Sequence, residues 1–491
     1  MRKLINVIIN EYVKILLKLS TIVMLIAVFL VALAYNGIML ITNRMQQKWF
    51  INIDAYYGTY DDQIARLKSS KSEGWETQVE ILTYLKDNDI PQNYLDDDHW
   101  MQTAVYAMFD KKDEAKAFSE AGETKKADKA LKTADEFEKA VAARDWKAYN
   151  RANVMVAQAN LDNNDYSGVK STYWRTDEYF EVLLWRAQYQ AEHEIPPIET
   201  HWKNRLLSGV MSQKCSLVGL TVVPEAERDR EAIAKAERKI MLWEYRLEND
   251  IRVDSSEYGG ITSQVDDSST STGFGFWRVF AGTPRGITFI SVMIIIIAGS
   301  VISSEFSTGT IKYLLVNPVK RYKIFIAKYV SVLSFAFLML FAYYLFNVLL
   351  SGLIFGFDDL GAPYLYVSNG EVAEGSSFLF VASKYLIASV GMICMATLSF
   401  AVSSLARSSA LSIGLGVFLY LSGYSVAAVM SGLDIDFGRY IIFANLELNE
   451  ISEGISLFKG QTLTFAIAVI GVYMTVFLLT AWDGFVRRDV K

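Results

Sequence analysis

Hydrophobic residues collect into six long runs that contain no Asp, Glu, Lys or Arg. The runs are Leu19–Ile41, Ile287–Ser304, Tyr329–Phe357, Tyr385–Ala406, Ser408–Leu433 and Gln461–Trp482. A helix needs roughly 20 apolar residues to cross the hydrocarbon core of a bilayer, and each run has 18 or more. We therefore predict six transmembrane helices, at 19–41, 287–304, 329–357, 380–406, 408–433 and 461–482.

A long polar segment, 42–286, separates the first two runs. Between Ala127 and Val141 its apolar residues recur every three or four positions, which is one face of a helix. The same spacing recurs in 177–194 and 225–250, whereas the Gly-, Ser- and Asp-rich stretch 254–275 is typical of a linker. The predicted fold class is an all-α polytopic membrane protein with six transmembrane helices and a large, mostly helical extracytoplasmic domain between the first and second spans.

Residues 1–18 place Ile5, Ile8, Tyr12 and Ile15 on one helical face, next to basic residues that flank the first run. This pattern favours an interfacial helix that lies on the cytoplasmic surface before the chain enters the bilayer. A plain basic flank is the alternative interpretation.

Composition agrees with a membrane protein, because 52% of the 491 residues are hydrophobic and the mean hydropathy is +0.20.

The distribution of charge predicts the orientation of the chain in the membrane. If both termini are cytoplasmic, the inner segments hold 13 Lys or Arg against 4 Asp or Glu, and the short outer loops hold 2 against 9. The inner segments are then 1–18, 305–328, Arg407 and 483–491, and the outer ones are 42–286, 358–379 and 434–460.

Sequence motifs for several kinds of chemistry are missing from the chain. It has no GxxxxGK[ST] phosphate-binding loop, no HExxH zinc motif and no GxSxG nucleophile motif. Two prolines separate His193 from His201, which argues against a shared metal site. We predict no catalytic, metal or cofactor site in this chain. The six runs also lack ionisable residues, which disfavours a self-contained ion-coupled carrier and favours a membrane subunit that is powered by another protein.

The segment between the second and third runs reads SSEFSTGTIKYLLVNPVKRYKIFIAKY, residues 303–329. Residues 305–310 are expected to turn the chain, and Ile311–Val316 to form a short amphipathic helix that Pro318 ends. Leu314 and Leu315 then lie on the side opposite to Lys312. Such a helix can transmit force from a soluble partner to two spans, whereas the alternative interpretation is a basic interfacial flank.

This segment closely resembles the signature of permeases of the bacterial type-2 ATP-binding-cassette export family. The matching positions are Glu305, Gly309, Thr310, Pro318, Arg321, Tyr322 and Lys328. The end of the chain, AWDGFVRRDVK, resembles the closing pattern of the family at Phe485, Arg488 and Asp489. The resemblance covers 1–45 and 276–491 well and covers the large domain poorly.

The resemblance implies a permease subunit in a bacterial cell membrane. A second permease chain, alike or different, and cytoplasmic ABC ATPase subunits would be its partners, besides membrane lipid, and no nucleic acid is implied. The ATPase subunits would bind the ATP, so this chain would hold no cofactor and would not be an enzyme. The implied ATPase-coupling segment contains Glu305, Gly309, Thr310, Ile311, Lys312, Leu314, Leu315, Pro318, Arg321 and Tyr322.

A second hypothesis is a membrane-anchored sensor or scaffold whose large domain binds a ligand or partner without transport. A third, a channel or carrier that works alone, is disfavoured by the charge-free runs. ATP-dependent movement of a substrate separates the first hypothesis from the second.

Overall fold

The computed structural model describes residues 2–17, 19–51, 58–93, 96–163, 176–199, 201–251, 275–310, 320–357 and 360–487. Within these ranges six helical segments are long and apolar enough to cross a membrane. They are α2 (Leu19–Ile51), α12 and α13 (Phe276–Gly282 and Ile287–Ser300, joined by the 3-10 turn η4, Thr283–Gly286), α16 (Arg321–Phe355), α17 (Ser377–Ala406), α18 (Ser409–Gly432) and α20 (Leu463–Trp482). The protein is therefore an all-α multi-pass membrane protein, as the sequence predicts.

The largest differences from the predicted span boundaries are at three helix ends. Helix α2 continues to Ile51, the second span begins at Phe276, and α16 begins at Arg321. Backbone hydrogen bonds continue through polar residues at the ends of an apolar run, so the run underestimates the helix. At the start of α12, Phe276 and Trp277 are buried, which extends the packed core beyond the apolar run itself.

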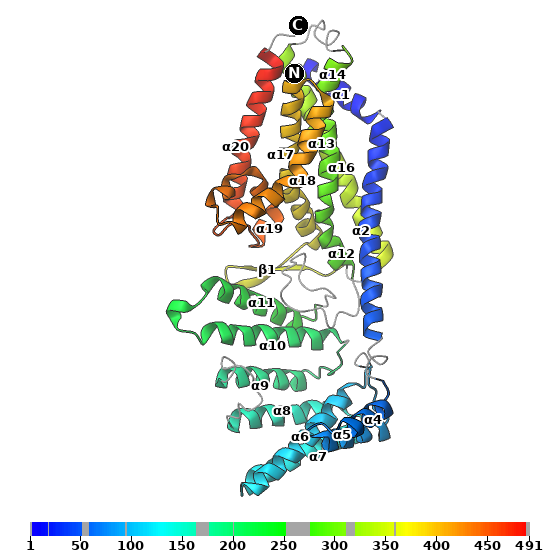
Figure 1. The fold of residues 1–491 in the computed structure, drawn as a ribbon, viewed down its shortest axis with the longest axis vertical. Helices are drawn as coiled ribbons and strands as arrows, with labels where there is room; N and C mark the ends of the chain where they lie inside the picture. Colours follow the sequence, from blue (N-terminus) through cyan, green and yellow to red (C-terminus); the bar gives the residue numbers. More distant parts are fainter. Residues whose placement is uncertain are drawn as a thin grey trace.

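One end of the bundle of spans, called the terminal end here, carries α1 (Arg2–Leu16), α14 (Ser303–Ser307) and the end of α20 (Figure 1). Helix α20 is followed there by a π-helical turn, η7 (Asp483–Arg487). Helix α1 is separate from α2 and packs against α16: Ile15 is buried, and the Ser331 hydroxyl donates to the Ile8 carbonyl at 3.3 Å. The N-terminal helix thus rests on the third span.

The opposite end, called the domain end, carries a domain of stacked helices (Figure 1). The helices are α4 (Tyr60–Ser70), α5 (Trp75–Asp87), α6 (Trp100–Glu120), α7 (Thr124–Ala143), α8 (Trp146–Asn163), α9 (Asp177–Glu192), α10 (Trp202–Thr221) and α11 (Arg230–Glu248), with the 3-10 turn η2 (Glu225–Glu227) before α11. One hydrophobic core lies around Phe137 and Leu85, and another around Leu207 and Val210. The segment is therefore helical, as predicted, and its helices bury their apolar faces on one another.

A β-hairpin joins α16 to α17 and meets the helical domain. Strands β1 (Tyr364–Ser368) and β2 (Glu371–Gly375) pair antiparallel, and their tip, Asn369-Gly370, has positive φ at both residues, as a tight two-residue hairpin requires. The Tyr245 hydroxyl of α11 donates to Glu374 Oε1 at 3.1 Å. This contact ties the helical domain to the loop between two spans.

The loop between α18 and α20 is made of three short helical turns, also at the domain end (Figure 1). They are η5 (Asp436–Tyr440), η6 (Ile442–Asn445) and α19 (Leu448–Ser452).

Small residues bring the spans close together inside this chain. A Cβ on Gly416 would lie 2.8 Å from Ile295 and 3.0 Å from the Ser399 hydroxyl, and one on Gly391 would lie 2.9 Å from the Leu446 carbonyl. Glycine is thus required at both positions for backbone approach. These two glycines therefore serve packing within one chain.

Candidate functional site

The most deeply buried charge of the spans lies at the terminal end. Lys328, in the third turn of α16, is 1% exposed. Its ammonium donates to Glu11 Oε2 at 2.9 Å, to Glu305 Oε1 at 3.1 Å and to the Val301 carbonyl at 3.3 Å. An ammonium has three donors, and each has an acceptor here. Lys14 donates to the other oxygen of Glu11 at 2.7 Å. We call Lys328, Glu11, Glu305, Lys14 and Thr310 the Lys328 junction.

The two carboxylates of the junction are stabilised in their charged form. Burial acts to raise the pKa of Glu11 and of Glu305, but the positive charge of Lys328 and hydrogen bonds to each carboxylate outweigh burial and lower both pKa values. The junction therefore holds two acids and two bases at neutral pH. Its charges balance, which a buried ionic cluster requires.

The Gly-Thr pair of the segment has a structural role at this junction. Gly309 has φ +74, a left-handed conformation that favours glycine, and it turns the chain after α14. The turn brings the Thr310 hydroxyl onto Glu305 Oε2, to which it donates a hydrogen bond. Thr308 and Thr310 also join their hydroxyls at 2.9 Å. The acid and the Gly-Thr pair thus form one hydrogen-bonded unit.

The junction holds both ends of the segment predicted to couple to an ATPase. The described chain stops at Thr310 and resumes at Lys320, and the predicted positions Ile311, Lys312, Leu314, Leu315 and Pro318 lie outside the described residues. On one side of this gap Glu305 and Thr310 belong to the junction, and on the other side Lys328 does. Helix α1 joins them through Glu11, so three segments that are distant in sequence meet at one ammonium.

Two of the remaining predicted positions, Arg321 and Tyr322, lie at the start of α16, and this part of α16 packs against the end of α20. Arg321 is the first residue of α16, and the Tyr322 ring lies 6.4 Å from that of Trp482. Phe325 and Phe485 are both buried, with ring centroids 6.0 Å apart. Phe485, the first residue of the closing pattern, is therefore packed against α16. The other two residues, Arg488 and Asp489, lie outside the described residues.

Sequence reasoning missed the role of Glu11. It treated residues 1–18 as a basic flank or interfacial helix, and it matched Lys328 to a family pattern without a partner. A signal was present, because Glu11 is the sole acid before Asp54 and lies on the apolar side of a helix. An isolated acid in such a context indicates a buried cation elsewhere in the chain.

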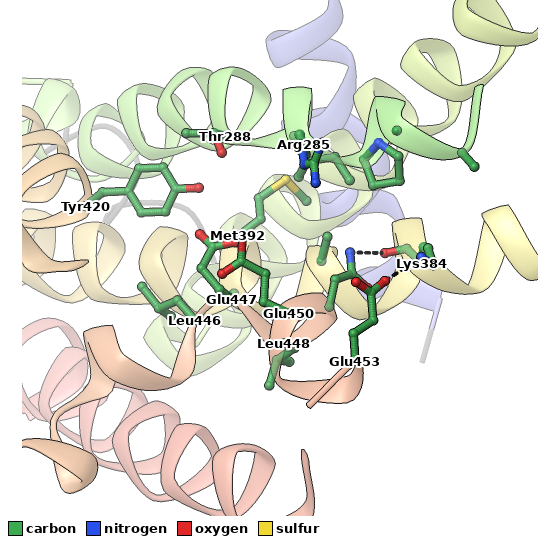
Figure 2. A pocket seen from close by; sticks show the side chains of 17 residues that line it. Arg285, Thr288, Lys384, Met392, Tyr420, Leu446, Glu447, Leu448, Glu450 and Glu453 are labelled. Atoms are coloured by element: carbon green, nitrogen blue, oxygen red, sulfur yellow. Dashed lines mark hydrogen bonds and ion pairs between the residues drawn. The ribbon is translucent and has the colours of Figure 1, made fainter. Parts of the chain in front are cut away.

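A second charged group lines a pocket of about 80 Å³ at the domain end (Figure 2). Lys384 is buried and pairs with Glu453 at 2.6 Å. Glu447 and Glu450 point toward the same space as Met392. The pKa of Glu447 is raised for two reasons. The surrounding protein disfavours its charged form, and the negative charge of Glu450 lies nearby. The signal for this group was the spacing of three acids at 447, 450 and 453.

Neither charged group resembles a metal centre. Among the described residues, no group of three or more His, Cys, Asp or Glu side chains is placed to hold a metal ion. The Lys328 junction is instead suited to holding segments together, since all its donors are occupied by protein acceptors.

Comparisons with known proteins find one family model and two similar bacterial proteins, one of which is described as a membrane protein. Residues 264–491 match the family model described as "Protein of unknown function (DUF2705)". The chain is 30% identical over 294 residues to "Uncharacterized protein YhcI" of Bacillus subtilis, covering 59% of this chain and 85% of the relative. It is 28% identical over 224 residues to "Uncharacterized membrane protein YdbK" of the same organism, covering 45% and 87%. No solved structure matches. The chain belongs to the same protein family as YhcI.

Proposed function

We propose that this chain is the membrane-spanning permease subunit of an ATP-driven ABC exporter in a bacterial cell membrane. The terminal end faces the cytoplasm, and the helical domain lies outside. A separate cytoplasmic ATPase binds and hydrolyses the ATP, and a second permease chain completes the complex. The observation that carries the proposal is the Lys328 junction, which fastens the segment between the second and third spans to both spans and to α1.

The junction supports a mechanical role for the segment. Separating Lys328 from Glu11 or Glu305 would leave an unpaired charge in a buried place, at a cost of about 3–5 kcal/mol. A push on residues 311–319 is therefore transmitted to α14, α16 and α1 together, because these elements resist separation. A loop that served only to reverse the chain would not need such a buried anchor at both ends.

The charge distribution supports the orientation. Lys and Arg gather at the terminal end and acids in the loops at the domain end, which favours a cytoplasmic terminal end. The basic segment then faces both anionic lipid and any cytoplasmic ATPase.

The proposal is tested by isolating an affinity-tagged chain from its native membranes in mild detergent. We expect an ATP-binding protein to copurify and the complex to hydrolyse ATP. Leu315→Asp should abolish copurification while the chain remains monodisperse, because a charge would replace an apolar docking residue. Lys320→Asp is the matched control and should retain the ATPase, since Lys320 is exposed and directly precedes the first residue of α16. Absence of any copurifying ATPase would overturn the proposal.

A membrane-anchored sensor or scaffold is the second candidate function. The contact between Tyr245 of the helical domain and Glu374 of the hairpin favours it, because this contact gives an event in the domain a route to two spans. Vesicles that contain the complex and ATP separate the candidates. Movement of a substrate supports the exporter, and ATP hydrolysis without movement of any tested substrate supports the sensor.

A further inference from the structure

A polar cavity lies inside the helical domain, apart from the Lys328 junction and from the pocket of Figure 2. Its volume is about 160 Å³, which is enough for several waters or one small solute. The walls come from the segment before α6, from α8 and α9, and from the connection between α9 and α10. The polar residues of these walls include Asp96, His99, Tyr149, Asn153, Arg186 and Glu199.

Arg186, on α9, brings a positive charge and an unused donor to this cavity. A terminal nitrogen of its guanidinium donates to the Ser208 hydroxyl at 3.2 Å. Its Nε is buried and has no hydrogen-bond partner among the residues that the structure describes. A guanidinium binds carboxylates through paired N–H groups. An unpaired N–H group at the cavity wall therefore suits a carboxylate ligand.

His99, just before α6, brings an unused acceptor. Its ring is hydrogen-bonded to the backbone of Pro91, which has no N–H group and can only accept, so the proton lies on the nitrogen that faces Pro91. Burial lowers the pKa of His99, so the ring is neutral at pH 7. Its Nδ1, buried and without a described partner, is then a free acceptor. Two carboxylates, Asp96 and Glu199, line the same cavity.

We propose that this cavity binds a small zwitterion of amino-acid size, with its carboxylate on Arg186 and its ammonium on His99 Nδ1 and Glu199. An anion alone would leave the acceptor and the acids unmatched, and a cation alone would leave the Arg186 donor unmatched. A molecule with both charges satisfies both walls at once. Tyr149, which lines the cavity, is only 7% exposed, and electrostatic interactions are stronger beside such buried surface than in open water. The inference does not depend on the exporter proposal, because it concerns the helical domain alone.

Binding is tested by calorimetry and thermal unfolding of the full chain in nanodiscs. Glycine and L-alanine are the probes, and acetate and methylammonium carry each charge separately. We expect the amino acids to raise the unfolding temperature as their concentration rises, and acetate and methylammonium at the same concentrations to have no effect. Arg186→Gln and Glu199→Gln should each weaken amino-acid binding by about tenfold or more.

Arg151→Gln is the control variant, since Arg151 is an exposed arginine on α8 and should not affect binding. If Arg186→Gln does not fold, as judged by circular dichroism, Asn153→Ala replaces it. No shift with either amino acid would mean that the cavity holds ordered water only and would overturn the inference. An equal response to acetate, or binding that survives both cavity substitutions, would also overturn it.

Discussion

At the scale of the residue, Lys328 matters most in this molecule. It is buried in a span, yet all three of its N–H groups meet acceptors, two of them carboxylates from other elements. Burying a charge without such partners is very costly. The lysine therefore specifies where α1 and the end of the second span must lie relative to the third, which hydrophobic contacts alone would specify less strictly.

Removing the lysine charge should destabilise the bundle. Lys328→Met leaves Glu305 without its cation and Glu11 with only the half-exposed Lys14, and we expect a loss of about 3–5 kcal/mol in the free energy of unfolding. Adding Glu11→Gln and Glu305→Gln to the same chain should recover part of the loss, because no buried charge is then left unpaired and Lys14 is half-exposed. Denaturant unfolding in detergent measures both effects. Lys139→Met, in an exposed pair with Glu136, is the control and should change little.

The lowered pKa of Glu305 predicts how its contribution depends on pH. A carboxyl whose folded pKa lies below its ordinary value of 4.5 stabilises the fold above that value and loses the contribution as the pH falls through the folded pKa. Wild type should therefore unfold at a higher temperature than Glu305→Gln at pH 7, and the difference should shrink below about pH 4.5. A difference that stays constant down to pH 3 would contradict the ionic role of Glu305.

At the scale of the element, the sequence predicted most of the helices and few of the connections. Apolar runs gave all six spans, because a span requires about 20 such residues. Their ends were misplaced where helices continue into basic residues, as at Arg321. The hairpin at 364–375 was not predicted, although Asn369-Gly370 is a strong hairpin signal. The partners of Lys328 and Lys384 depend on contacts between distant segments, which local patterns do not contain.

A polar pair inside the membrane holds the first span to the third. Asn36 Nδ2 donates to Asn347 Oδ1 at 3.1 Å, and the Ser351 hydroxyl donates to Asn36 Oδ1 at 2.8 Å. We expect Asn36→Leu to destabilise the bundle by roughly 1–2 kcal/mol, because the two groups on α16 lose their partner. Ile38→Leu, on the exposed face of the same helix, should have no measurable effect. If the two variants have equal free energies of unfolding in detergent, the asparagine pair contributes nothing to stability.

At the scale of the whole molecule, the two ends of the bundle are built for different tasks. The terminal end is basic and carries the Lys328 junction, with three elements fastened at one ammonium. The domain end is acidic and carries stacked helices that touch the spans through the hairpin (Figure 1). This division matches the proposed exporter, in which force enters at one end and the large domain acts at the other.

The most direct test of this account is site-directed crosslinking from the segment that the junction anchors. Lys312→Cys and Leu315→Cys are made singly in a chain with Cys215→Ser and Cys394→Ala. Asp434→Cys, exposed in the loop at the domain end, is the control. We predict that both segment positions crosslink to a copurifying ATPase, that ATP changes the yield, and that the control does not crosslink. Failure of both positions to crosslink, with no ATPase present, would contradict the account.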